Sequence, residues 1–120
     1  GNQPGDNNKS EGTQPKPPVI DFEQVFYDFG SIKQGEKVSY TFEFKNIGGE
    51  PLVIKDAYAS CGCTVPEFSK KPIPPGKGGK IEVIFDSSGR SGNQYKSVVV
   101  KTNTPGGKER LTIQANVITN

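Results

Sequence analysis

Residues 36–45 read EKVSYTFEFK, and apolar and polar side chains alternate through this segment. Every second side chain is apolar, and the apolar positions are Val38, Tyr40, Phe42 and Phe44. Successive side chains of a strand point to opposite faces of a sheet. The alternation therefore predicts a β-strand with one face in a core and the other in water.

Similar short segments occupy most of the chain after residue 18, and turn residues separate them. The predicted strands cover residues 19–22, 25–29, 36–45, 52–60, 80–86, 94–102 and 110–118. Residues 66–79 are rich in proline, glycine and lysine and predict a loop. About seven short strands at regular spacing predict an all-β, immunoglobulin-like antiparallel β-sandwich, with a small β-barrel as the alternative.

The composition agrees with an all-β domain. The 120 residues include 10 Val and 9 Ile but only 2 Leu and 3 Ala, and β-branched side chains suit strands better than helices. Residues 1–18 contain no apolar or aromatic side chain other than proline. We therefore expect a flexible polar linker or tether at residues 1–18 and a single sandwich domain at residues 19–120.

Several classes of function are disfavoured by simple counts. The chain contains no His, which removes the usual general base and the usual zinc ligand. Its net charge of +2 is too small to indicate a nucleic-acid partner. No apolar run is long enough for a transmembrane helix. We expect a non-enzymatic protein without a cofactor, a nucleic-acid partner or a transmembrane segment.

The two cysteines, Cys61 and Cys63, are one residue apart, so in an extended strand their sulfurs would project from the same face. A disulfide between them requires the chain to bend at Gly62 and would be a redox candidate. Alternatively, two thiolates bind a soft metal such as Cu(I). In a third interpretation the pair only packs at the end of a strand. The sequence leaves these alternatives open and indicates no other metal ligands.

A reactive cysteine needs a nearby cation, and Lys70 and Lys71 are candidates for that role. Tyr58 is the aromatic residue nearest to the cysteine pair. The lysine-rich loop has two interpretations, which are protection of a strand edge and contact with an anionic partner. The predicted binding site, with no catalytic residue, consists of Tyr58, Cys61, Gly62, Cys63, Thr64, Lys70 and Lys71.

Many short motifs in residues 19–118 together resemble the bacterial domain of unknown function 1573, which is common in Bacteroidetes. The most specific of them is Ser60-Cys61-Gly62-Cys63-Thr64. The others are Asp28-Phe29-Gly30, Ile32, Gly35, Phe42, Phe44, Asn46, Gly48, Pro51-Leu52, Ile54, Ile73, Pro75-Gly76, Ile81, Val83, Phe85-Asp86, Gly89-Arg90 and Gly92. This pattern is also similar to ASH, Hydin and major-sperm-protein domains.

The resemblance implies an immunoglobulin-like sandwich and export to the periplasm, the outer membrane or the cell surface. It often implies a lipoprotein, anchored through an N-terminal lipidated cysteine that this chain does not contain. We expect a monomeric binding or spacer module that contacts a protein or glycan of the cell envelope. The alternative is a periplasmic redox or Cu(I)-handling protein that uses Cys61-Gly62-Cys63.

Overall fold

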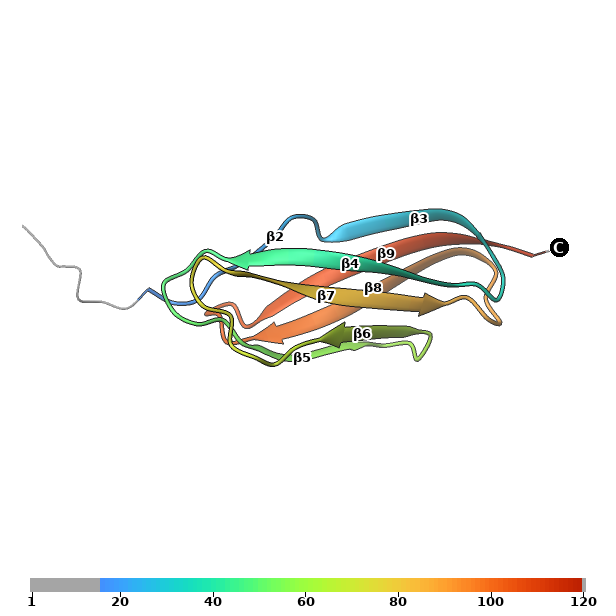
Figure 1. Ribbon diagram of the computed structural model, residues 1–120. Coiled ribbons are helices and arrows are strands. Elements are labelled where there is room, and N and C mark those ends of the chain that lie inside the picture. Colours follow the sequence, from blue (N-terminus) through green and yellow to red (C-terminus); the bar gives the residue numbers. More distant parts are fainter. Residues whose placement is uncertain (1–15, 120) are drawn as a thin grey trace, which may run out of the picture.

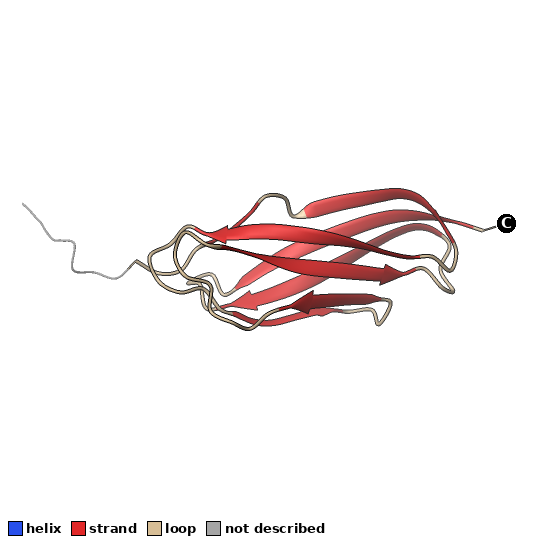
Figure 2. Cartoon of the chain, in the orientation of Figure 1, coloured by secondary structure: helices blue, strands red, loops and turns tan. Residues whose placement is uncertain are grey.

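The computed structural model of the protein describes residues 16–119, and every regular element in that range is a β-strand (Figures 1 and 2). In chain order the strands are β2 (Ile20–Phe22), β3 (Phe26–Lys33), β4 (Lys37–Asn46), β5 (Ile54–Ala59), β6 (Thr64–Phe68), β7 (Gly78–Asp86), β8 (Gly92–Thr102) and β9 (Lys108–Ile118). The predicted sandwich is confirmed, with eight strands in the described residues. The linker predicted for residues 1–18 lies outside the described residues as far as residue 15.

Two four-stranded sheets pack face to face, with strand orders β2-β4-β7-β6 and β3-β9-β8-β5. In Figure 1 the first sheet lies in front of β8 and β9 of the second. All strand pairs are antiparallel except β3 and β9, which are parallel. This pair departs from the expected antiparallel sandwich. It arises because the chain crosses from one sheet to the other between β2 and β3.

The alternation that predicted β4 places its apolar face in the core, where Phe42 is fully buried. The stacked rings of Tyr27 and Tyr40, with centroids 3.8 Å apart, join the two sheets at one side of the sandwich. The buried apolar residues are Ile32, Phe42, Phe44, Leu52, Ile54, Ala57, Ile81, Val83, Phe85, Val98, Val100, Leu111, Ile113, Ala115 and Val117. Burial of these side chains holds the two sheets together.

The structure differs from the predicted strands at two places. Pro66 lies in β6, although residues 66–79 were expected to form a loop. Proline is tolerated there because β6 is an edge strand and pairs only with β7. Gly30 lies within β3, beyond the predicted end of this strand at residue 29, at a bulge between Asp28 and Ser31. Its φ of 73° and its N–H bond to Asp28 Oδ1 (2.8 Å) fit this irregular position.

Asn46, at the end of β4, is buried and connects several loops. Its Nδ2 donates to the carbonyl oxygens of Glu50 (2.7 Å) and Ile73 (2.9 Å). Its Oδ1 accepts from the backbone N–H groups of Gly48 (3.0 Å) and Val19 (3.3 Å). The amide group therefore donates two hydrogen bonds and accepts two, so its donors and its acceptor all have partners. These bonds hold together the loops at the end of the sandwich where the described chain begins (Figure 1).

Candidate functional site

Cys61 and Cys63 form a disulfide in the loop between β5 and β6, and their Cα atoms are 5.2 Å apart. The loop is a turn closed by the Thr64 N–H, which donates to the Cys61 carbonyl oxygen (3.1 Å). The Asp86 N–H donates to the Cys63 carbonyl oxygen (2.8 Å) and connects this turn to β7. The cysteines thus lie in a hydrogen-bonded turn and not in an extended strand.

The bend that a Cys61–Cys63 disulfide requires is present, but its geometry does not require glycine. Gly62 is not among the described glycines with positive φ. A Cβ atom built at Gly62 would meet no heavy atom within 4 Å, its chain neighbours aside. The turn is therefore held by its hydrogen bonds and the disulfide, and a small side chain at this position is compatible with it.

Two hydrogen-bond donors face the sulfur of Cys61. Arg90 Nη2 donates to Cys61 Sγ at 3.1 Å, and the backbone N–H of Cys63 donates to the same atom at 3.1 Å. The sulfur of Cys63 lies 3.6 Å from Thr64 Oγ1. A guanidinium group stays charged at any physiological pH. The two sulfurs of the disulfide therefore have different environments, with the cation on the Cys61 side.

Neighbouring loops hold Arg90 in place. The Arg90 N–H donates to the Ser87 carbonyl oxygen (3.0 Å), and Gln34 Nε2 donates to the Arg90 carbonyl oxygen (2.8 Å). Ser87 is fully buried, and its hydroxyl lies 2.7 Å from the carbonyl oxygen of Glu36 and 3.1 Å from that of Lys33. The β7–β8 loop is thus fastened to the β3–β4 turn, which positions the guanidinium beside the sulfur.

A hollow of about 410 Å³ adjoins the disulfide on the Cys63 side. Val65 and Ile84, which pair across β6 and β7, form its apolar part. The residues that line it are Lys37, Gly62, Cys63, Val65, Ile84 and Asp86. Cys61 and Arg90 do not line this hollow, so of the two half-buried cysteines only Cys63, which also packs against the hydrophobic core, adjoins it.

The Asp86 carboxyl at the rim of this hollow is ionised at neutral pH. Hydrogen bonds from the Ser88 backbone and side chain, and the nearby positive charge of Lys37, hold the pKa of Asp86 below its ordinary value. Burial raises the pKa by less than the hydrogen bonds lower it, and the effect of Lys37 is the smallest of these. The rim therefore carries two adjacent opposite charges, because Asp86 of β7 and Lys37 of β4 are directly paired in the sheet.

The structure brings Cys61, Gly62, Cys63 and Thr64 together and places the other predicted site residues elsewhere. Lys70 and Lys71 follow the far end of β6, about 16 Å along the strand at about 3.3 Å per residue. Tyr58 is 44% exposed on β5, opposite Val99 of β8, and does not line the hollow beside Cys63.

The cation beside the sulfur is Arg90, which sequence reasoning missed because it lies 29 residues after Cys61. A signal was present in the sequence. Arg90 stands between Gly89 and Gly92, which both have a φ of 74° and shape the β7–β8 loop. A single arginine presented by a glycine-containing turn was a candidate for a functional cation.

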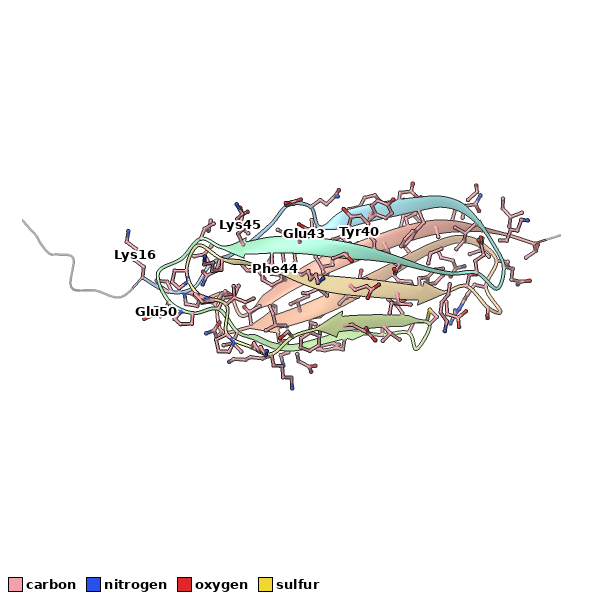
Figure 3. The ribbon with its side chains drawn as sticks, viewed as in Figure 1. Lys16, Tyr40, Glu43, Phe44, Lys45 and Glu50 are labelled. Atoms are coloured by element: carbon pink, nitrogen blue, oxygen red, sulfur yellow. A yellow bond between two sulfur atoms is a disulfide. The ribbon has the colours of Figure 1, made fainter. Side chains whose placement is uncertain are left out.

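A second, larger hollow of about 670 Å³ lies around the end of β6 and the following loop. It includes Lys71 of the predicted site but not Lys70. Its lining residues are Thr41, Phe44, Glu67, Phe68, Ser69, Lys71, Pro72, Ile73, Pro74, Lys77, Gly78, Gly79, Lys80 and Glu82. Figure 3 places Phe44 along β4, with Lys45 and Glu50 toward the end of the sandwich where the described chain begins.

Within residues 16–119 no group of three or more cysteine or acidic side chains is arranged to hold a metal ion. The sulfurs of Cys61 and Cys63 are bonded to each other, so in this state they are not thiolate ligands. The same part of the chain contains no helix that is long and apolar enough to span a membrane.

Solved structures with the same fold come from very different proteins. A protein of unknown function from Porphyromonas gingivalis W83 has a TM-score of 0.70 at 17% identity, over 95% of this chain and 53% of its own length. The VesB protease of Vibrio cholerae has a TM-score of 0.63 at 19% identity, over 83% of this chain and 32% of its own. The ASH/PapD-like domain of human CEP192 has a TM-score of 0.66 at 12% identity, over 92% and 93%.

These identities are low, so the likenesses show the fold alone. This chain spans about half of the Porphyromonas protein and a third of the protease. No curated protein matches the chain. The family model described as Protein of unknown function (DUF1573) matches residues 20–117, which include every strand from β2 to β8 and nearly all of β9. This chain therefore belongs to the DUF1573 family, with an immunoglobulin-like, PapD-like sandwich fold.

Proposed function

We propose that this protein is an exported, non-catalytic binding module that recognises an extended acidic segment of another cell-envelope protein. The observation that carries the proposal is the 670 Å³ hollow at the end of β6. Its volume falls within the range of about 300–1,000 Å³ that is typical of ligand sites. The hollow combines an apolar surface with three lysines, Lys71, Lys77 and Lys80.

The lining of this hollow favours a polypeptide over a glycan. Its two aromatic residues are Phe44, which is 3% exposed, and Phe68, which is half-buried, so neither offers an open ring face for a sugar to stack on. The prolines Pro72 and Pro74 offer apolar contact without a backbone donor. The three lysines outnumber the two acidic residues of the lining, so acidic side chains of a ligand would be attracted to the rim.

Binding at a hollow fits this sandwich better than pairing at a strand edge. Of the four edge strands, β2 has three residues, β3 and β5 carry irregular register, and β6 contains Pro66. Short strands, bulges and proline are the devices that prevent edge-to-edge pairing. A partner that added a strand to either sheet would have to displace these features.

We also propose export and attachment through a lipid on the N-terminal side of the domain. The Cys61–Cys63 disulfide supports export, because disulfides persist in oxidising compartments and are rare in the cytosol. The described chain begins at one end of the sandwich, and the β5–β6 loop lies at the other (Figure 1). An N-terminal anchor would therefore direct the disulfide away from the membrane. Lipid labelling and surface proteolysis of cells that produce the protein test this arrangement.

Fluorescence anisotropy with a labelled decapeptide of alternating Glu and Val tests the binding site. Three exposed charge pairs at about 0.2–1 kcal/mol each correspond to a loss of roughly tenfold in affinity. We expect this loss for the triple variant Lys71→Gln, Lys77→Gln, Lys80→Gln.

A control with the same change of charge replaces Lys33, Lys101 and Lys108, which are exposed and do not line the hollow. This variant should bind the peptide within about twofold of the unmodified protein, because only the lysines of the hollow are expected to contact it. Equal weakening in both triple variants would refute the proposed site. Binding of an acidic oligosaccharide in place of the peptide would refute the proposed ligand.

A further inference from the structure

We propose that the Cys61–Cys63 disulfide is a redox-active site that oxidises a dithiol of a partner protein, with Cys63 as the attacked sulfur and Cys61 as the leaving group. This inference is independent of the binding role, because it rests on the opposite end of β6 and on different residues. It follows from the asymmetric surroundings of the two sulfurs.

The surroundings of the Cys61 sulfur stabilise a negative charge on it. When the S–S bond breaks heterolytically, the departing sulfur becomes a thiolate, and a departing thiol with a lower pKa leaves faster. Arg90 Nη2 and the Cys63 N–H both donate to Cys61 Sγ at 3.1 Å, and hydrogen bonds to a charged sulfur are stronger than those to a neutral one. An adjacent arginine lowers the pKa of a cysteine thiol. Both donors therefore stabilise Cys61 as the leaving thiolate.

The guanidinium is in position before the reaction. Its loop is fixed by the Gln34 and Ser87 hydrogen bonds, and Arg90 is half-buried beside the sulfur. Stabilisation of the thiolate thus requires no rearrangement of the loop, which is the condition for an effective electrostatic contribution.

Both cysteines are half-buried, and Cys63 is the one that adjoins a hollow in which a partner side chain can bind. Cys63 lines the 410 Å³ hollow together with Val65 and Ile84, and Val65 is 46% exposed. An apolar side chain next to the partner's cysteine can pack on this surface and bring its thiolate to Cys63 Sγ. Cys61, on the other hand, faces Arg90.

The reaction balances as a two-electron exchange. The partner's thiolate attacks Cys63 Sγ, a mixed disulfide forms, the Cys61–Cys63 bond breaks, and its electron pair goes to Cys61 Sγ. The partner's second thiolate then attacks the sulfur of the partner's first cysteine in the mixed disulfide. This step releases Cys63 as a thiolate, which takes up a proton. The partner leaves as a disulfide, and the protein gains the two electrons in its reduced cysteines.

The site is suited to accept electrons because Arg90 stabilises the reduced form more than the oxidised form. A disulfide oxidant of this kind is strong because its reduced state is stabilised. The closed ring spans only three residues, so the bond contributes little chain-entropy stabilisation to the fold. Reduction therefore leaves the sandwich folded and able to be reoxidised.

Trapping the mixed disulfide tests the direction of attack on the unmodified protein. The protein is treated with excess glutathione, quenched in acid, alkylated with N-ethylmaleimide and sequenced by mass spectrometry. We expect glutathione on Cys63 and the alkyl group on Cys61. Glutathione on Cys61, or an equal distribution over both cysteines, overturns the proposal.

The role of Arg90 is tested by the rate of reduction and by the equilibrium with a glutathione buffer. If the guanidinium lowers the Cys61 pKa by about one to two units, a rate coefficient of about 0.5 per unit predicts that Arg90→Gln slows reduction by about three- to tenfold. The same variant should shift the equilibrium toward the disulfide, and Arg90→Lys should restore part of both effects.

The matched control is Lys70→Gln, which removes the same charge at the far end of β6 and should leave rate and equilibrium unchanged. A cyclic peptide of residues 60–64 provides the same disulfide ring without Arg90. If the folded protein is reduced no faster than this peptide, or if Arg90→Gln matches the unmodified protein, the disulfide is inert and the proposal fails. Binding of the acidic peptide remains measurable in either case, so the two proposals are tested separately.

Discussion

Replacing Asn46 with alanine should destabilise the fold more than any other single change of a polar side chain at that end of the sandwich. The side chain is buried and forms four hydrogen bonds to the backbones of three separate segments. At about 0.5–1.5 kcal/mol for each bond, the total is about 2–6 kcal/mol. Water can reach part of the backbone that is left, because Gly48 and Glu50 are half-buried, so we expect the lower half of that range.

The expected loss is therefore about 2–4 kcal/mol, out of a total of about 5–15 kcal/mol for an ordinary domain. Urea denaturation followed by circular dichroism measures it. With a slope of about 2 kcal/mol per molar urea, the middle of the usual range, the midpoint should fall by about 1–2 M. Asn116→Ala, an exposed asparagine on β9, is the matched control and should change stability by less than about 0.5 kcal/mol.

Asn46→Asp separates hydrogen bonding from loss of volume. It keeps the shape and both accepted bonds, but it replaces the Nδ2 donor with an oxygen that faces the carbonyl oxygens of Glu50 and Ile73. We expect it to be at least as destabilising as alanine at neutral pH. A loss below about 1 kcal/mol for Asn46→Ala, or a neutral effect of Asn46→Asp, would refute the assignment of Asn46 as the centre of this end.

Two further changes test other features. Gly79→Ala should cost about 1–3 kcal/mol in thermal or urea denaturation, because its Cβ would lie 2.6 Å from the Phe44 ring, whereas Gly62→Ala should stay within about 0.5 kcal/mol. The pKa of Asp86 is lowered in the folded state, so Asp86 binds fewer protons there than in the unfolded state. Its stabilising contribution is therefore fully present above the ordinary pKa of about 4. This contribution is lost as the pH falls through the lowered pKa. Acid titrations of stability should therefore be flatter below about pH 4 in Asp86→Asn, and parallel curves would contradict this.

Much of the fold could be predicted from periodicity. The alternation in residues 36–45 specified which face of β4 is buried, since a one-residue shift would expose Phe42 and Phe44. β6 could not be predicted in the same way, because Pro66 is a strong signal against a central strand and the sequence does not say which strands are edges. The parallel pairing of β3 with β9 depends on the crossing between sheets, which no local pattern encodes.

The candidate site was only partly predictable. The cysteine pair is local, so a disulfide was one of the states that its spacing allowed, but the cation that faces Cys61 comes from a loop 29 residues later. Proximity in sequence favoured Lys70 and Lys71, but both follow the end of β6 that is far from the disulfide. The role of Asn46, which the sequence showed only as part of the family pattern, could not be predicted because its partners Val19 and Ile73 are each 27 residues away.

The parallel arrangement of β3 and β9 bears on how the domain responds to mechanical force. Phe26 at the start of β3 lies opposite Thr112, and Lys33 at its end lies opposite Ile118 near the end of β9. Tension applied before β3 and after β9 pulls these two strands in opposite directions along their length. The force then acts on all the hydrogen bonds between the two strands at once, and they do not break one after another. Resistance to pulling depends on the barrier to unfolding and not on equilibrium stability. This geometry is therefore expected to make the sandwich resist shear when the chain is pulled from both sides of the β3–β9 pair.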